Sequence, residues 1–430
     1  MTNCPWVPRL LPDPGLAVDR LGLDDHLRVH GPVPSALRSG EHDVVGLADE
    51  VNLRGRGGAG FPFARKARGV RTGRDEHGGA PLVVANGSEG EPASRKDAEL
   101  LRRAPHLVLD GLVLAAVAVG AREARLVVGD PAARRSAQAA LHERRQHDRP
   151  WKLRGPRVRT TVVAVQDRFV AGESSAVVRA SAGKPPVPAF SLTRTAAGGV
   201  NGRPTLVSNV ETLAQLAVLA RLGVSGYRSV GTTDEPGTTL LTVHLPGRSD
   251  VVEVALGTAL TDVLGATGRP GAVLVGGYHG GWLAGRTAAS TVLSRAGLDA
   301  VGWTLGAGVV VALPDSACPL VEAAPVVRFL ADESAGQCGP CVHGLAAIAS
   351  AVTALASGTA GTGDVAKLRR WAGLVAGRGA CAHPDGVVRF VSSLLGAFPT
   401  EVALHQHHAC GRLAHGLLPV QPGQALGETA

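Results

Sequence analysis

The sequence is poor in aromatic residues and has no apolar run long enough to cross a membrane. Phe, Trp and Tyr together make up 3% of the 430 residues, so any core must be built from Val, Leu and Ala. The longest apolar stretches, Leu107–Ala121 and Val301–Leu313, are shorter than the roughly 20 residues that a transmembrane helix needs. No secretion signal is visible, because prolines interrupt the first residues. These absences favour a cytoplasmic protein without a transmembrane segment.

The positive charge lacks the pattern that nucleic-acid binding requires. The net charge is +8, but the arginines that supply it are scattered and are not interleaved with aromatic residues. We therefore expect no nucleic-acid partner. A chain of this length predicts two to four domains, because a single hydrophobic core does not grow that large.

The order of apolar segments predicts an α/β region, then a small mixed module, then a helical end. In the first region, strands are expected at Pro81–Ala85, Arg125–Gly129 and Arg157–Val165, and helices at Val44–Asn52, Ala98–Gly120 and Pro131–His147. This alternation is typical of a mostly parallel sheet covered by helices. Residues 182–204 are interpreted as a long ordered loop or a boundary.

The pattern changes at Gly237. In the mixed module, Thr238–Leu245 and Asp250–Val254 form an expected hairpin, followed by a helix at Leu260–Ala266 and a strand at Ala272–Val275. In the last region, helices are expected at Ala323–Asp332, Leu345–Ala356, Val365–Ala376, Gly386–Leu395 and Glu401–Leu413.

A glycine-rich segment, RGRGGAGF at Arg54–Phe61, contains G-x-G-x-x-G. A dinucleotide-binding turn needs a preceding strand, and the segment before this one looks helical, so the usual Rossmann turn is not expected. Residues without Cβ still let backbone amides approach a phosphate, and Arg54, Arg56 and Lys66 supply positive charge. The alternative is an ordinary glycine-rich loop.

Three polar segments follow apolar ones. Asn86–Asp97 comes directly after an expected strand, where α/β sheets place ligands, and Asn86 can both donate to and accept from a flavin edge. Phe169–Ala176 and Ser208–Thr212 each open a helix. Helix capping is the alternative for all three.

The cysteines are concentrated near the end of the chain. Cys338 and Cys341 are spaced C-x-x-C, and Cys381 follows. In a chain without a secretion signal this spacing favours an iron–sulfur cluster or zinc.

In this order, the five segments resemble the NADH-oxidising flavoprotein subunit of respiratory complex I, a family that includes diaphorase subunits of hydrogenases and formate dehydrogenases. The resemblance covers roughly Leu53–Pro399. It implies a Rossmann-like FMN- and NAD(H)-binding domain at 41–236, a β-grasp domain of the SLBB type at 237–315, and a helical iron–sulfur domain at 316–415. An N-terminal extension (1–40) and a tail (416–430) would flank them.

The resemblance also implies roles for single residues. Gly55, Arg56, Gly57 and Lys66 would hold the FMN phosphate, Asn86 and Asn209 the flavin, and Phe61 would stack on the nicotinamide or adenine; Glu91, Glu173 and Lys184 would engage the dinucleotide. Gly60, Glu89, Gly172 and Thr212 complete the expected cofactor site, and Cys338, Cys341 and Cys381 the metal site. The flavin would carry hydride transfer, so no catalytic side chain is expected. Electrons would pass to a ferredoxin-like or membrane-associated partner subunit, which allows a peripheral position at the inner face of a membrane.

Several positions depart from the family pattern. Ser88 and Ser174 stand where the family has acids, Phe169 replaces a tyrosine and Ser208 an asparagine, and Ala335 replaces the first cluster cysteine. The lost acids could raise the flavin potential or relax the choice between NADH and NADPH. Three thiolates could hold a [4Fe–4S] cluster with an open or water-bound iron, a [3Fe–4S] cluster, or none. The residues considered as a fourth ligand are Asp332, His343, His383 and Cys410.

Other functions remain open at this stage. The chain could be a non-catalytic nucleotide-binding or regulatory paralogue. It could bind zinc through Cys338, Cys341 and Cys381 with His405, His407 or His408, although the HQHHAC stretch is better interpreted as a solvated terminal helix. Quinone or cobalamin binding by the β-grasp module rests on analogy alone.

Overall fold

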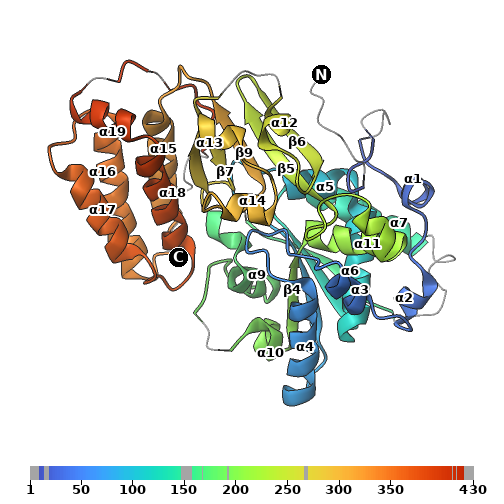
Figure 1. Cartoon of the computed structure of the whole chain (residues 1–430). Helices are drawn as coiled ribbons and strands as arrows, with labels where there is room; N and C mark the ends of the chain where they lie inside the picture. The colour runs from blue at the N-terminus through green and yellow to red at the C-terminus, as the bar shows by residue number, and fades with distance from the viewer. Residues whose placement is uncertain are drawn as a thin grey trace.

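The structure is a computed structural model that describes residues 9–13, 19–146, 157–166, 168–190, 193–265, 270–408, 410–412 and 414–420. Most of the predicted N-terminal extension is described, but its first eight residues and the last ten of the tail lie outside these ranges, as do His147 and Ala266 at the ends of two predicted helices. Figure 1 shows the helices that follow residue 318 (α15–α19) gathered on the left of the molecule, beside the strands β7 (Ala272–Val275) and β9 (Val309–Leu313), with α1 (Leu23–His30), α7 (Pro131–Gln146) and α11 (Val210–Arg228) on the right.

The first sheet is parallel throughout. Its strands are β1 (Leu82–Gly87), β2 (Glu123–Val128), β3 (Arg159–Ala164) and β4 (Thr205–Asn209), in the spatial order β3-β2-β1-β4. Side chains alternate between two cores, so that Val83 and Ala85 face one layer of helices while Leu82 and Val84 face the other. The predicted parallel α/β sheet is therefore confirmed.

Helices cover both faces of this sheet. They are α1 (Leu23–His30), α2 (Ser35–Ser39), α3 (Val44–Glu50), α4 (Phe63–His77), α5 (Lys96–Arg103), α6 (Pro105–Val119), α7 (Pro131–Gln146), α9 (Ser174–Ser181), α10 (Thr195–Gly198) and α11 (Val210–Arg228), with the 3-10 turns η1 (Phe169–Gly172) and η2 (Val200–Gly202). Helices α6 and α11 pack so closely that a Cβ atom at Gly111 would lie 1.8 Å from the Leu213 carbonyl oxygen. This contact fixes α11, whose first residues reach the site described below.

The second sheet is mixed. Its strands are β5 (Thr238–Leu245), β6 (Arg248–Ala255), β7 (Ala272–Val275), β8 (Gly281–Ala284) and β9 (Val309–Leu313), in the order β6-β5-β9-β7-β8, with β5 and β9 parallel. The predicted hairpin around Pro246 and Gly247 is present. Short helices α12 (Leu260–Leu264), α13 (Gly285–Ala289) and α14 (Arg295–Asp299) accompany the sheet.

The C-terminal region is helical, as predicted. It contains α15 (Pro319–Asp332), the π-turn η3 (Pro340–Leu345), α16 (Ala346–Ala356), α17 (Asp364–Val375), α18 (His383–Ala397) and α19 (Pro399–Gln406). Leu274, Val309 and Val311 of the second sheet pack into the core of these helices. No one helix among the described residues has the length and apolar composition of a membrane span, although α18 and α19 taken together, bent by 87°, meet that test.

Two predicted helices have different limits. The single helix predicted at Ala98–Gly120 is two, because Pro105 begins α6 and the preceding Ala104 leaves the helical conformation. The terminal helix predicted to reach Leu413 ends at Gln406, and His408 takes a left-handed backbone conformation with φ 69°.

Candidate cofactor and iron–sulfur sites

The first site lies where the order of the parallel strands reverses. Strands β2 and β3 follow β1 on one side of it, and β4 then pairs with β1 on the other side. Asn86 at the end of β1 and Asn209 at the end of β4 are direct partners in the sheet register. Ligands of open α/β sheets bind in the crevice at such a point, beyond the carboxyl ends of the strands. The two asparagines predicted to contact a flavin therefore lie side by side there.

The glycine-rich loop lies over the start of α11 at this crevice. The amide of Arg56 donates to Thr212 Oγ1 at 2.8 Å, and a Cβ atom at Gly57 would lie 3.2 Å from Asn209 Cβ. The Gly55 amide donates to the Phe61 carbonyl oxygen at 3.0 Å and closes the loop. The loop follows α3 and not a strand, which confirms that it is no standard Rossmann turn.

Lys66 brings a half-buried positive charge to the same crevice. It lies on α4, directly after the glycine-rich loop, and its Nζ donates to the Val207 carbonyl oxygen of β4 at 3.0 Å. Partial burial lowers the pKa of Lys66, because no carboxylate among the described residues compensates the lost hydration of its ammonium. An anionic group in the crevice would restore that compensation.

The turn η1 meets β1 in the crevice. Asn86 Nδ2 donates to the Gly172 carbonyl oxygen at 2.9 Å, while Asn86 Oδ1 accepts from the amide of Ser88 at 3.1 Å. The buried Ser88 hydroxyl has no hydrogen-bond partner among the described residues. The glycine-rich loop, the end of β1, the turn η1 and the start of α11 therefore meet at the crevice. The Ser88 hydroxyl remains available to hydrogen-bond a ligand.

Two predicted cofactor-binding acids also cap helices. The carboxylate of Glu89 accepts from the amides of Asp97 and Ala98 at the start of α5. Glu173 accepts from the amides of Ser175 and Ala176 at the start of α9. Both therefore have a structural role that is independent of a dinucleotide.

Glu91 is the third predicted acid, and it is buried. Its Oε2 accepts from the Tyr278 amide at 2.8 Å and Oε1 from the Ala93 amide at 3.4 Å, and burial raises the pKa of Glu91 to about 8. Because an unfolded glutamate ionises near pH 4.3, the folded state holds the extra proton between these values and stability falls as the pH rises through them.

Glu91→Gln should flatten that pH dependence, since an amide does not titrate. We expect the free energy of unfolding of the wild type to drop by up to a few kcal/mol between about pH 5 and 8, and that of the variant to drop less. Urea denaturation at both pH values measures the difference. Glu41→Gln, at an exposed position, is the control; an unchanged pH slope in Glu91→Gln would contradict the assignment.

A buried ionic cluster behind the loop was not predicted. Lys96 Nζ lies 2.7 Å from Asp97 Oδ1 and 2.9 Å from Glu211 Oε2, and Asn209 Nδ2 donates to Asp97 Oδ2 at 2.6 Å. Burial opposes the charge on Lys96, but the carboxylates of Asp97 and Glu211 raise its pKa above the usual value. These residues belong to the polar segments Asn86–Asp97 and Ser208–Thr212. Membership in those segments is the sequence feature that could have indicated them.

The cluster connects the two sheets. Glu211 Oε1 accepts from the amide of Leu240 at 3.0 Å and from the hydroxyl of Thr239 at 3.1 Å, both on β5. The Arg56 guanidinium lies 3.8 Å from the same oxygen and donates to the Thr238 carbonyl oxygen at 3.2 Å. The glycine-rich loop is thereby held against the second sheet as well as against α11.

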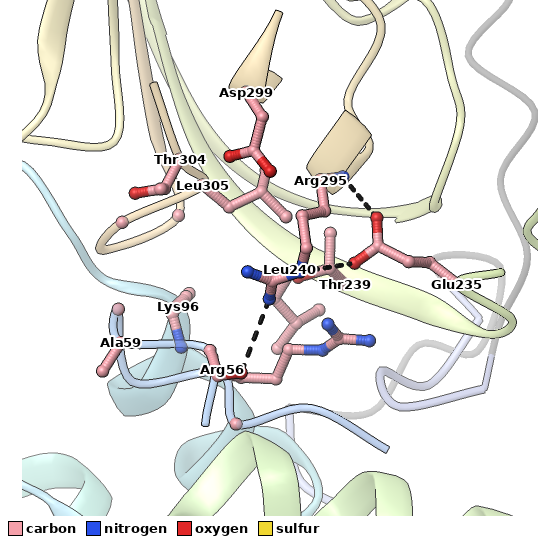
Figure 2. Close-up of a pocket in the computed structure, with 15 residues that line it drawn as sticks. Arg56, Ala59, Lys96, Glu235, Thr239, Leu240, Arg295, Asp299, Thr304 and Leu305 are labelled. Atoms are coloured by element: carbon pink, nitrogen blue, oxygen red, sulfur yellow. Dashed lines mark hydrogen bonds and ion pairs between the residues drawn. The ribbon is translucent and has the colours of Figure 1, made fainter. Parts of the chain in front are cut away.

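A cavity lies between the glycine-rich loop and the second sheet (Figure 2). It encloses about 560 Å³, open solvent at its mouth included. Arg56 and Lys96 line one side, while Arg295 of α14 lies across from them, where its Nη2 donates to the Gly60 carbonyl oxygen at 3.5 Å. Glu235 accepts from the backbone amide of Arg295.

The remaining predicted cofactor residues lie outside this cavity. Asn86 and Gly172 do not line it, so the cavity and the β1–β4 crevice are different spaces that share the loop. Phe61 is exposed, with the Arg65 guanidinium 5.5 Å from its ring centroid. Lys184 is exposed after the end of α9, and the described side-chain contacts do not join it to the other predicted residues.

The three predicted cysteine ligands line one small cavity. Cys338, Cys341 and Cys381 share it with Ala335, Gln337, Ala380, His383, Val170 and Pro188. Burial, reinforced by the Cys338 thiol, raises the pKa of Cys341 to about 12, so a thiolate there needs a metal to compensate its charge. The cavity holds the three thiols together with the alanine that replaces the missing one.

The spacing of these thiols favours a cluster over zinc. Among the described residues, the one group of three His, Cys or carboxylate ligand atoms within 4.8 Å of one another is a different one, Cys318, His405 and Cys410. Two thiolates on one zinc ion would be about 3.8 Å apart, given tetrahedral Zn–S bonds of about 2.3 Å. The predicted grouping of His405 with the Cys338 set is therefore wrong, because His405 packs against Cys318.

Of the four residues considered as a fourth cluster ligand, His383 lines the cavity. Its Nε2, however, lies 2.8 Å from the Leu330 carbonyl oxygen, and its Nδ1 lies 3.1 Å from His279 Nε2. Cys410 lies with Cys318 instead. Both ring nitrogens of His383 are thus engaged, which leaves three protein ligands as the arrangement the described residues support.

A parallel sheet with a crevice at its switch point, joined to helices that hold three thiols, defines a two-centre redox protein. The comparisons with known proteins agree. Residues 48–218 match the Nuo51 FMN-binding domain, and residues 322–405 match the NADH-ubiquinone oxidoreductase-F iron–sulfur binding region. In both regions the chain is similar to the F subunits of NADH-quinone oxidoreductase.

Several relatives extend over most of the chain. The NADH-quinone oxidoreductase F subunit numbered 2 of Rhizobium meliloti (strain 1021) is 29% identical over 84% of this chain and 88% of its own length. The F subunit of the Streptomyces coelicolor enzyme is 29% identical over 88% and 85%. A solved NAD+-reducing [NiFe]-hydrogenase in the H2-reduced state superposes with a TM-score of 0.76 at 27% identity, over 90% of this chain and 67% of that one. The fold predicted from the resemblance is confirmed.

Proposed function

We propose that the chain takes electrons from NADH through FMN to an iron–sulfur cluster and delivers them to a partner electron carrier. The observation that carries this proposal is the turn η1. Its Gly172 carbonyl oxygen accepts from Asn86 in the crevice, while Val170, two residues earlier, lines the cavity of the three cysteines. Two sites that share a single turn are close enough for electrons to pass between them.

The residues of the crevice fit a flavin mononucleotide. The glycine-rich loop, whose residues without Cβ let the backbone approach a ligand, and the Lys66 ammonium, which has no carboxylate partner among the described residues, would hold the phosphate. Asn86, Asn209 and the unpaired Ser88 hydroxyl would face the polar edge of the ring. The flavin supplies hydride and electron transfer when bound; the protein supplies position and the exclusion of water.

The dinucleotide would lie against the exposed Phe61. We propose this face because an aromatic ring there can stack on a base, and because the cavity beside Gly60 opens next to it. Glu91, Glu173 and Lys184 stay proposed contacts. The division at residues 41–236, 237–315 and 316–415 is likewise our proposal, supported by the change from the parallel sheet to the mixed sheet to helices.

The partner would be a second protein, either ferredoxin-like or membrane-associated. Relatives of this chain are named as subunits of NADH-quinone oxidoreductase, and the solved structure is named as an NAD+-reducing hydrogenase. We propose a cytoplasmic protein that reaches the inner face of a membrane only through such a partner.

Anaerobically purified protein should be yellow-brown, with flavin absorbance that bleaches on addition of NADH. Flavin, iron and sulfide are quantified on the same sample, EPR follows the cluster, and rates are compared for NADH and NADPH because Ser88 and Ser174 replace acids. Bound flavin that neither nucleotide bleaches would instead support a regulatory paralogue. Protein without flavin after reconstitution would overturn the proposal.

A further inference from the structure

A second cluster of metal-ligating side chains lies away from both sites. The ligand atoms of Cys318, His405 and Cys410 all lie within 4.8 Å of one another, and Cys318 Sγ is 3.2 Å from His405 Nε2. Cys318 and His405 are buried, with exposed fractions of 0% and 4%, and Cys410 is half-buried. Their proximity is a product of the fold, since Cys318 and His405 are 87 residues apart in the sequence.

Local structure brings the three residues together from two directions. Cys318 is the N-cap of α15 and precedes Pro319, which begins that helix. His405 lies in the last turn of α19. The chain then leaves the helix through His407 and the left-handed His408, and Cys410 follows. The early end of α19 is what lets Cys410 reach the same point as His405.

We propose that Cys318, His405 and Cys410 bind a zinc ion, with water in the fourth position. Thiolate and imidazole are the ligands that zinc prefers, and three of them converge here. Tetrahedral Zn–N and Zn–S bonds of about 2.1 and 2.3 Å place a nitrogen and a sulfur ligand about 3.6 Å apart, and Cys318 Sγ and His405 Nε2 lie 3.2 Å apart without the ion. Cys410 is half-buried, so the fourth position opens toward solvent.

The ion links the segment that follows α19 to the start of α15. After Cys410, the amides of His415 and Leu417 donate to the Glu322 carboxylate in the first turn of α15, and the Tyr278 hydroxyl donates to the Pro419 carbonyl oxygen. The segment is therefore tied to α15 and β7–β8 by hydrogen bonds on one side. The zinc ion ties the segment to α15 as well, at the point where the segment leaves α19.

This site is separate from the three-cysteine cavity. Helix α15 has 14 residues, about 20 Å at 1.5 Å per residue, and the zinc site lies at its beginning while the cluster loop follows its end. Loss of one metal should therefore leave the other in place, and the two assignments can fail independently.

Metal analysis of the full chain, purified under reducing conditions without added zinc, tests the proposal. We expect about one zinc per chain, and a loss of at least five-fold in each of Cys318→Ser, His405→Gln and Cys410→Ser. Flavin and iron contents should stay at the wild-type level, which also shows that the variants fold. His407→Ala, an exposed histidine on the same segment, is the matched control and should keep its zinc.

Two further measurements keep the outcome decisive. X-ray absorption at the zinc edge of the wild type should show two sulfur ligands at about 2.3 Å and nitrogen or oxygen ligands at about 2.0–2.1 Å. Full zinc content in His405→Gln and Cys410→Ser, or no zinc after reconstitution of reduced protein, overturns the proposal. A Cys318–Cys410 disulfide in non-reducing peptide maps of protein without zinc also overturns it.

Discussion

Cys381→Ala should remove nearly all of the iron from the protein. Ala335 stands at the position of the first family cysteine, and His383 beside the cavity is engaged through both ring nitrogens. The protein therefore offers three thiolates, and two are too few to hold a cluster that is normally bound by four. We expect iron and sulfide per chain to fall at least ten-fold and the EPR signals of the cluster to disappear.

Gln337→Ala is the matched control, because Gln337 lines the same cavity without offering a thiolate. Its iron content should stay near that of the wild type. In Cys381→Ala the flavin should still be bleached by NADH, since the crevice proposed to hold it at Asn86 is separate from the cysteine cavity. Retention of iron in Cys381→Ala would show that another residue completes the cluster, and would refute the three-thiolate assignment.

Lys66→Met should weaken FMN binding by about 10- to 100-fold. The substitution keeps an unbranched side chain only one atom shorter but removes the half-buried ammonium. Hydrogen bonds to charged groups contribute about 1.5–3 kcal/mol. Titration of the flavin-free protein with FMN, followed by flavin fluorescence, measures the dissociation constant. Riboflavin, which lacks the phosphate, should bind the variant and the wild type with similar affinity.

Arg65→Met provides the comparison for Lys66→Met. Arg65 is the adjacent cation, but its guanidinium lies over the exposed Phe61 ring and not in the crevice. FMN affinity should therefore change little in Arg65→Met. Equal losses in the two variants would indicate a general effect of positive charge and would remove Lys66 from the phosphate site.

The sequence was most informative where apolar runs are local and bounded. β1, β2 and α7 follow from such runs and lie within two residues of their predicted limits. β4 was not predicted, because Thr205–Asn209 is short and its last residue caps the next helix, so the strand and helix patterns merge. That strand completes the crevice, and only its pairing with β1 shows that Asn86 and Asn209 are neighbours.

Contacts across the chain account for what sequence reasoning missed. Lys96 and Glu211 form an ion pair although they are 115 residues apart, so the sequence could single out the polar segments that contain them but not their pairing. The sequence did not group Cys318 with His405 and Cys410, because Cys318 and His405 are 87 residues apart and Cys410 was placed inside a helix that ends at Gln406. Glu89 and Glu173 illustrate the opposite difficulty, since a side chain that caps a helix has the same sequence pattern as one that contacts a ligand.

The ionic cluster around Glu211 has a consequence for how tightly a cofactor can be held. Because this one carboxylate contacts Arg56, Lys96 and the backbone of β5, the shape of the glycine-rich loop is set when the chain folds and not when a ligand arrives. Little chain entropy then remains to be lost on association, and most of the attraction between phosphate and protein is expressed as affinity.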